Sequence, residues 1–125
     1  MIDARTRIVG IIGWPVEHSL SPAMHNAAFA ALGLNWAYAA FPVPPDRVEE
    51  AVRGLAAAGC AGLNVTIPHK RAVLGACSGA SDAVRAIGAA NTLVPDGSGG
   101  YRADNTDAPG FLRALDEQAP LALEG

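Results

Sequence analysis

The chain has 125 residues, half of them apolar, and carries a formal net charge of −3. This length is typical of one domain with a sizeable core, and the composition excludes an intrinsically disordered chain. No long run of lysines and arginines occurs and no apolar run reaches about 18 residues, so we expect neither a nucleic-acid-binding surface nor a membrane span.

The first half of the chain predicts three strands. The β-branched run at 7–12 is closed by turn residues and indicates a buried strand. The segments 35–43 and 61–67 are also apolar, and we expect them to form the second and third strands. Because helical segments separate these strands, the predicted β-α-β-α-β order favours parallel strands joined by right-handed crossovers.

Two helices are predicted between these strands. The first is expected to start at Ser21 and to end before Gly33. Ser21 followed by Pro22 is typical of an N-cap with proline at the first helical position, and glycine often follows the last turn of a helix. The second helix is expected across 44–59, where apolar residues recur at helical spacing before a terminal glycine.

The second half of the chain predicts shorter elements. Helices are expected near 69–75 and across 81–88. The segment 91–104 is typical of a β-hairpin with DGSGG as its turn, and a last helix is expected over 106–118. The predicted fold class is therefore α/β, a three-layer sandwich around a mostly parallel mixed sheet with one antiparallel hairpin.

The cysteines and histidines do not predict a metal site. Cys60 and Cys77 form no CxxC motif and have no histidine partners at zinc spacing. His18, His25 and His69 are not spaced as metal ligands, and we expect them to be structural or exposed to solvent. The N-terminus lacks the apolar region of a signal peptide, so we expect a cytoplasmic protein with reduced cysteines.

Polar side chains gather where the predicted parallel strands end. Open α/β sheets bind ligands outside the carboxyl ends of their strands, and parallel neighbours bring those ends to one edge. The hydroxyl, carboxamide, ammonium and carboxylate groups at these positions suit a small polyhydroxylated carboxylate. The residues are His18, Ser19 and Ser21 after the first strand, Asn64, Thr66 and Lys70 at the end of the third, and Asn91, Asp104, Asn105 and Asp107 around the hairpin.

Four motifs of this chain together resemble one family. GWPVEHSLSPAMHN, GLNVTIPHK, GAANTLV and ADNTDAPGF occur in this order between residues 13 and 111. They are similar to the substrate-binding domain of shikimate dehydrogenases, including the quinate/shikimate branch. The resemblance implies an oxidoreductase that uses NADP to reduce 3-dehydroshikimate to shikimate, in the pathway that leads to chorismate and the aromatic amino acids.

The resemblance assigns catalysis to Lys70 and Asp107, both of which would also contact substrate. Oxidation of an alcohol to a ketone removes a proton from oxygen as well as a hydride from carbon. A lysine beside the hydroxyl can accept that proton and return it in the reverse direction, while the aspartate orients the hydroxyl and the lysine. On an unrelated chain, Lys70 would be a solvated surface residue and Asp107 a first-turn helix aspartate.

The resemblance also implies further substrate ligands. Ser19, Ser21 and Thr66 would bind the carboxylate, and Asn91 and Asn64 would bind ring hydroxyls. Each of these residues could instead have a structural role. Ser21 could cap its helix, Thr66 could serve strand propensity alone, and the asparagines could satisfy buried backbone groups.

The chain contains no motif for a dinucleotide. A GxGxxG pattern between a strand and a helix is missing, and GSGGY belongs to the predicted hairpin turn. In the family, the nucleotide-binding domain follows the helix that carries Asp107. We therefore expect residues 1–125 to be a truncated substrate-binding domain, with 103–125 as a helix and lead-in to an absent domain that would bind NADP. Alone, such a chain would be inactive.

Three alternatives stay open. Within the family, the protein could be a quinate/shikimate dehydrogenase that uses NAD. It could also be a non-catalytic domain that binds a shikimate-like ligand. Cofactor-dependent turnover would exclude this alternative. It could also have a structural role in association, because Phe111, Leu112 and Leu115 form an apolar stripe at helical spacing in the last predicted helix. We expect such a surface to form a homodimer.

Overall fold

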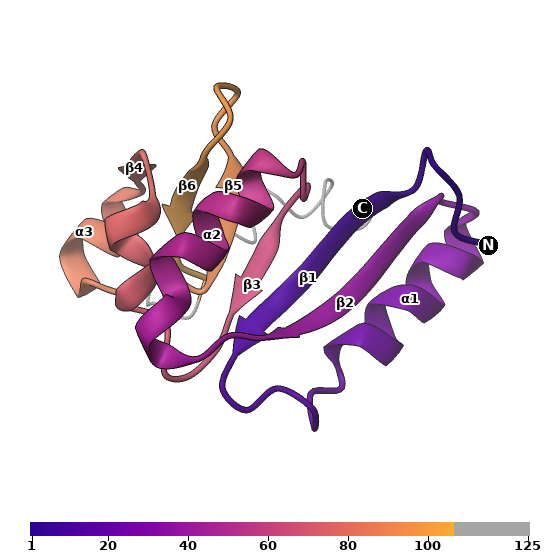
Figure 1. Cartoon of the computed structure of the whole chain (residues 1–125), viewed down its shortest axis with the longest axis horizontal. Coiled ribbons are helices and arrows are strands. Elements are labelled where there is room, and N and C mark those ends of the chain that lie inside the picture. The colour runs from indigo at the N-terminus through magenta and orange to yellow at the C-terminus, as the bar shows by residue number, and fades with distance from the viewer. Residues whose placement is uncertain (107–125) are drawn as a thin grey trace.

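A computed structural model describes residues 1–106 of the chain (Figure 1). Within this range, the strands form one sheet in the order β2-β1-β3-β5-β6-β4. The strands are β1 (Arg7–Gly13), β2 (Trp36–Pro42), β3 (Leu63–Val65), β4 (Gly79–Ala80), β5 (Thr92–Pro95) and β6 (Tyr101–Asp104). The helices are α1 (Ser21–Leu32), α2 (Val48–Ala57) and α3 (Asp82–Ile87), with the 3₁₀ helices η1 (Pro45–Arg47) and η2 (Ala72–Ala76).

The sheet has a parallel part and a hairpin. β1 pairs in parallel with both β2 and β3, as the β-α-β-α-β order predicts. β5 runs antiparallel to β3 and to β6, and the short β4 is parallel to β6. The predicted α/β class, with a mixed sheet and one hairpin, is confirmed.

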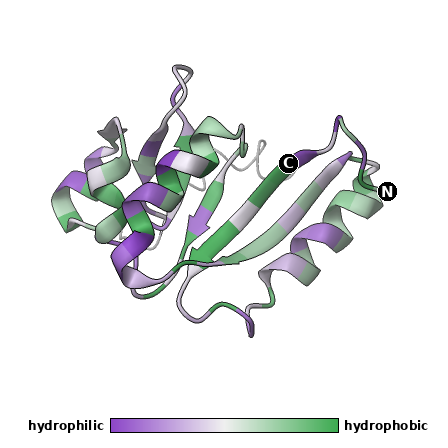
Figure 2. Ribbon diagram, in the orientation of Figure 1, coloured by the Kyte–Doolittle hydropathy of each residue, from purple (hydrophilic) through white to green (hydrophobic). Residues whose placement is uncertain are grey.

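The two faces of β1 pack against different helices. Successive side chains of a strand point to opposite faces of its sheet. Ile11 belongs to a cluster with Phe29 of α1 and Tyr38, whereas Ile12 belongs to a larger cluster with Val48 and Val52 of α2. Helices therefore lie on both faces of the sheet, and Figure 2 shows β1 as largely apolar, which is typical of a strand buried on both faces.

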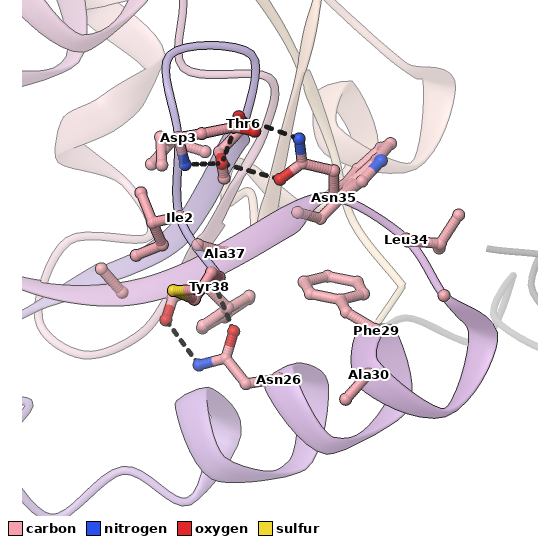
Figure 3. Close-up of a pocket in the computed structure, with 15 residues that line it drawn as sticks. Ile2, Asp3, Thr6, Asn26, Phe29, Ala30, Leu34, Asn35, Ala37 and Tyr38 are labelled. Carbon is pink, nitrogen blue, oxygen red and sulfur yellow. Dashed lines mark hydrogen bonds between the residues drawn. The ribbon is translucent and has the colours of Figure 1, made fainter.

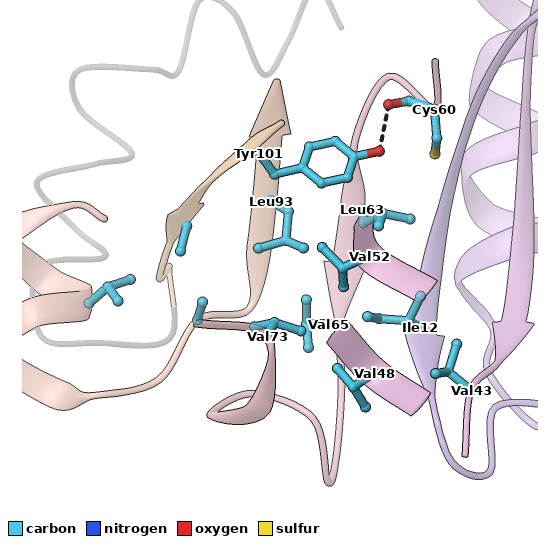
Figure 4. Close-up of a cluster of buried hydrophobic side chains, with 13 residues drawn as sticks. Ile12, Val43, Val48, Val52, Cys60, Leu63, Val65, Val73, Leu93 and Tyr101 are labelled. Carbon is cyan, nitrogen blue, oxygen red and sulfur yellow. Dashed lines mark hydrogen bonds between the residues drawn. The ribbon is translucent and has the colours of Figure 1, made fainter. Parts of the chain in front are cut away.

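The larger cluster extends from α2 to the hairpin (Figure 4). Val73 of η2, Leu93 of β5 and Tyr101 of β6 contribute to it and are almost completely buried. The Tyr101 hydroxyl donates a hydrogen bond to the backbone carbonyl of Cys60 at 2.6 Å, so this buried polar group is satisfied. The core thus fixes the hairpin against the parallel part of the sheet.

Ser21 is the first residue of α1 and not its N-cap, which corrects the sequence prediction. Leu20 occupies the N-cap position with helical dihedral angles (φ −86°, ψ −7°), and no side-chain cap forms there. The Ser19 hydroxyl instead accepts a hydrogen bond from the Ser21 backbone N–H at 3.2 Å. The serine that satisfies the start of this helix therefore lies two residues earlier than the Ser-Pro pattern indicates.

Other boundaries also differ from the predictions. The strand expected at 61–67 is limited to the three residues of β3, and the helix expected near 69–75 is the 3₁₀ helix η2. β4 was not predicted, because two residues are too short for a periodic pattern and this strand forms by pairing with β6. The last predicted helix, 106–118, together with the homodimer surface assigned to it, lies outside the described residues.

Gly10 lies where β1 and β2 approach closely. A Cβ atom at this position would overlap the carbonyl oxygen of Ala39 and lie 2.5 Å from Cε2 of Phe41. We expect Gly10→Ala to lower the free energy of unfolding by about 1–3 kcal/mol, because the neighbouring strand has to move. Chemical denaturation measures this change.

Gly54 provides the matched control, because nothing lies within 4 Å of a Cβ atom at this position of α2. Gly54→Ala is expected to raise the free energy of unfolding by about 0.5–1 kcal/mol, since alanine loses less backbone entropy in a helix. Equal effects of the two substitutions would contradict the close approach at Gly10.

Candidate functional site

The carboxyl ends of β1 and β3 lie side by side and bring two loops together. The Thr66 backbone N–H donates to the carbonyl of Ile12 at 3.0 Å, and the Trp14 N–H donates to the carbonyl of Ile67 at 3.2 Å. The loop after β1 is therefore hydrogen-bonded to the turn after β3. This is the edge at which the sequence predicts ligand binding.

Gly13 allows this close approach. A Cβ atom at Gly13 would overlap Cγ2 of Thr66 and lie 2.6 Å from Cγ1 of Val16, so a larger residue would force the two loops apart. Val16 is buried, and its carbonyl accepts a hydrogen bond from the Ser19 N–H at 3.0 Å. The absence of a side chain at position 13 thus helps to set the distance between Ser19 and Thr66.

Lys70 is half-buried on the turn after β3. The preceding His69 is buried, and its Nε2 lies 2.6 Å from the carbonyl oxygen of Val43. Because a carbonyl only accepts, the ring donates from Nε2, and this histidine is structural as expected. The Lys70 carbonyl accepts a hydrogen bond from the Ala90 N–H at 2.7 Å, so the turn is held from both sides.

Asn91 connects the site to the end of the hairpin. Its carbonyl accepts a hydrogen bond from the Val65 N–H at 2.8 Å. Its carboxamide donates to Oγ1 of Thr106 at 2.8 Å and accepts from the Thr106 N–H at 3.0 Å. These bonds fix the backbone one residue before Asp107, the predicted catalytic aspartate, which itself lies outside the described residues.

Asn64 takes part in a hydrogen-bonded group on the α1 face of the sheet. The Tyr38 hydroxyl donates to Oδ1 of Asn64 at 2.6 Å. Burial raises the pKa of Tyr38 to about 12, although the nearby Ser21 side chain acts in the opposite direction. The phenol is therefore a protonated donor at neutral pH.

Sequence reasoning missed Tyr38. In the sequence, an aromatic residue in a predicted strand is explained by strand propensity alone. Tyr38 lies on β2 and reaches Asn64 on β3 although β1 lies between these strands. The alternation of side chains along a strand could place Tyr38 and Asn64 on the same face of the sheet. Only the order of the strands shows that the Tyr38 side chain can span β1 and reach Asn64.

A separate hollow of about 740 Å³ lies between α1, β2 and the N-terminal segment (Figure 3). Thr6, Phe29 and Asn35 line it, so it opens at the amino ends of β1 and β2, away from the edge described above. Asn26 and Tyr38 also line it: Nδ2 of Asn26 donates to the Tyr38 carbonyl at 2.9 Å, and the Tyr38 N–H donates to Oδ1 of Asn26 at 2.8 Å. None of the predicted ligand-binding residues lines this hollow.

Two further observations concern residues 1–106 only. In this range, no group of three or more His, Cys, Asp or Glu side chains is arranged to hold a metal ion. Over the same residues, no helix combines the length and the apolar character needed to cross a membrane.

The family match and similar curated proteins indicate the same family. Residues 11–93 match the family described as the shikimate dehydrogenase substrate binding domain. A shikimate dehydrogenase (NADP(+)) of Methanopyrus kandleri is 59% identical over 117 residues, which are 94% of this chain and 40% of that protein.

Solved structures agree with the sequence matches. A shikimate dehydrogenase in complex with NADP+ has a TM-score of 0.83 at 44% identity, over 94% of this chain and 41% of that one. The shikimate 5-dehydrogenase of Listeria monocytogenes, in complex with shikimate and NAD, has a TM-score of 0.82 at 40% identity, over 94% and 40% of the two chains.

The matched range includes most of the residues that the sequence predicts to bind the ligand. The matched residues 11–93 contain Ser19, Ser21, Asn64, Thr66, Lys70 and Asn91. The chain spans about 40% of the length of the curated relatives it matches. With more than half of its residues matched, the chain belongs to the family of shikimate dehydrogenase substrate binding domains.

Proposed function

We propose that this chain binds shikimate at the carboxyl edge of β1 and β3, as the substrate-binding part of an NADP-linked shikimate dehydrogenase. The reaction interconverts 3-dehydroshikimate and shikimate. The observation that carries the proposal is that hydrogen bonds bring the loop after β1, the turn that carries Lys70 and the residue Asn91 to one edge of the sheet. The identity to a named shikimate dehydrogenase supports the choice of ligand.

The hydroxyl groups of the edge bind the carboxylate of the ligand. Ser19, Ser21 and Thr66 each offer a hydroxyl that can donate to a carboxylate oxygen, and such charge-assisted hydrogen bonds are stronger than neutral ones. Asn64 and Asn91 bind ring hydroxyls, because a carboxamide both donates and accepts. This division places the acid near the loop after β1 and the alcohols near β3 and the hairpin.

Lys70 and Asp107 carry out proton transfer at the reacting alcohol. In the oxidation direction, the lysine accepts the hydroxyl proton while the carbon loses hydride; in reduction, the lysine donates the proton to the carbonyl oxygen. Asp107 orients the hydroxyl. The hydrogen bonds between Asn91 and Thr106 support this role, because they fix the backbone next to Asp107.

The glycine-rich turn between β5 and β6 does not fit the phosphates of a dinucleotide. The Asp96 carboxylate fills the glycine-rich turn between β5 and β6, where it accepts from the N–H groups of Ser98 at 2.7 Å and Gly100 at 3.1 Å. The hydrogen bond from Ser78 and those from the turn hold the pKa of Asp96 well below its usual range, so the turn is anionic. NADP, which the names of the relatives include, would be bound outside residues 1–106.

An activity assay of the full-length protein that carries this chain tests the proposal. We expect saturable, shikimate-dependent formation of NADPH, with NAD and quinate as the alternative cofactor and substrate in parallel assays. Binding of shikimate without turnover with either cofactor would indicate a non-catalytic ligand-binding domain. A protein that neither binds nor oxidises shikimate would contradict the proposal.

We infer a cytoplasmic location, which is supported by two free cysteines, Cys60 and Cys77, of the kind that reducing compartments preserve. We also propose that the chain forms a homodimer, as the sequence predicts. Sedimentation equilibrium tests it, and a monomer at all concentrations would contradict it.

A further inference from the structure

Tyr38 is a buried polar residue that has no role in the proposed function. Its side chain is only 6% exposed. Its hydroxyl donates to a proposed ligand-binding residue, with Oδ1 of Asn64 accepting at 2.6 Å. A buried phenol could be satisfied by a backbone carbonyl, as Tyr101 is, so its use of a side chain of the candidate site requires an explanation.

The ring of Tyr38 is held in place by α1. The imidazole of His25 stacks on it with the ring centroids 4.4 Å apart and an interplanar angle of 5°. The Asn26 carboxamide binds both the N–H and the carbonyl of Tyr38, at 2.8 and 2.9 Å. Phe29 and Ile11 complete the cluster around the ring. These contacts hold both the backbone and the ring of Tyr38, and they therefore fix the position of its phenol oxygen.

The hydrogen bond between Tyr38 and Asn64 distinguishes the two ends of the carboxamide. A phenol has one proton, and Tyr38 gives it to Oδ1 of Asn64. With Oδ1 bound to the phenol, the Asn64 carboxamide directs its N–H groups away from Tyr38, where they can donate to a ligand oxygen.

We propose that Tyr38 is a positioning residue that orients the Asn64 carboxamide so that Asn64 donates to a hydroxyl oxygen of the ligand. The identity of the ligand rests on the proposed function, whereas the orientation of Asn64 does not. Ser21 does not depend on Tyr38 in the same way. The Ser21 hydroxyl carries its own proton, so removal of the phenol leaves this donor to a carboxylate intact.

The substitution Tyr38→Phe tests the proposal, because it keeps the ring and removes only the hydroxyl. We expect the affinity for shikimate, measured by calorimetry, to fall roughly tenfold, as is typical for the loss of one well-placed hydrogen bond. Tyr101→Phe is the matched control: it also removes a buried hydroxyl with a 2.6 Å hydrogen bond, but its partner is the backbone of Cys60. This control is expected to leave the affinity unchanged.

Double substitutions test whether Tyr38 acts through Asn64 or through Ser21. In an Asn64→Ala background, Tyr38→Phe is expected to cause no further loss of affinity, because the residue that Tyr38 orients is already missing. In a Ser21→Ala background, Tyr38→Phe is expected to cause its full loss. The reverse result, with additivity at Asn64 and none at Ser21, would overturn the proposal.

Nuclear magnetic resonance without ligand decides the geometry independently of the proposed function. In the wild-type chain, Oδ1 of Asn64 faces the phenol, so the side-chain amide protons should point away from the Tyr38 ring and give only weak nuclear Overhauser contacts to it. Strong contacts between these amide protons and the ring would mean the flipped carboxamide and would overturn the proposal even if Tyr38→Phe fails to fold. If the amide protons point away from the ring but wild type does not bind shikimate, the orientation stands and the assigned ligand is wrong.

Discussion

Replacement of Lys70 by alanine is expected to lower kcat of the full-length protein by about two to four powers of ten, the usual contribution of a positioned acid or base. KM for shikimate should change much less, because the carboxylate and ring hydroxyls retain their own ligands. The physical reason is that no other group is proposed to exchange a proton with the reacting oxygen. Steady-state kinetics with shikimate and NADP measures both constants.

Arg71 offers a matched control for Lys70, because it is the next residue, carries the same charge and is exposed. Arg71→Ala should leave kcat within a factor of about two, as expected of an exposed charge that makes no contact with substrate. Lys70→Arg should be nearly as inactive as Lys70→Ala, because a guanidinium does not release its proton at neutral pH. Near-normal kcat in Lys70→Ala would refute the catalytic assignment.

Replacement of both Ser19 and Ser21 by alanine is expected to raise KM for shikimate by about two to four powers of ten, from the loss of two hydrogen bonds to a charged group. kcat should fall much less, because the carboxylate is held similarly in the ground state and the transition state. The free energy of unfolding should fall because of Ser19, whose hydroxyl accepts the Ser21 N–H at the start of α1, and should change little because of Ser21, which does not cap α1. Kinetics and chemical denaturation of the double variant measure these effects.

Ser98→Ala is the control for this pair, because Ser98 is an exposed serine in the turn between β5 and β6. Its KM should match that of the wild type. If the double variant keeps the wild-type KM, the two serines only shape the loop after β1. A fall in kcat with unchanged KM would instead place them near the reacting atoms.

Much of the fold is predictable because it depends on local patterns. The apolar runs around Ile12 and Leu63 predict parallel strands, and the glycine-rich turn at DGSGG predicts the hairpin. Gly88 adopts a left-handed φ of 78° at the end of α3, and the Ser81 hydroxyl caps the start of this helix by accepting from the Val84 N–H at 3.3 Å. In each case, the local conformation favours the residue type that the sequence has at that position.

The features that sequence reasoning missed depend on tertiary contacts. The conformation of Leu20 makes Ser21 a helical residue, although Ser-Pro is typical of a cap. β4 exists only because β6 lies beside it. Tyr38 acquires its partner Asn64 from a strand two positions away in the sheet. The sequence predicts the hydroxyl and amide residues of the candidate site, whereas the hydrogen bonds among them require the strand order.

Titration of the isotope-labelled chain with shikimate, followed by two-dimensional nuclear magnetic resonance, tests most directly whether the carboxyl edge of β1 and β3 is the binding site. We predict saturable shifts of the backbone amides of Ser19, Ser21, Thr66 and Lys70, which flank that edge. The hollow of about 740 Å³ at the amino ends of β1 and β2 is an internal alternative. Shifts confined to its lining residues, or no saturable shifts at all, would contradict the assignment.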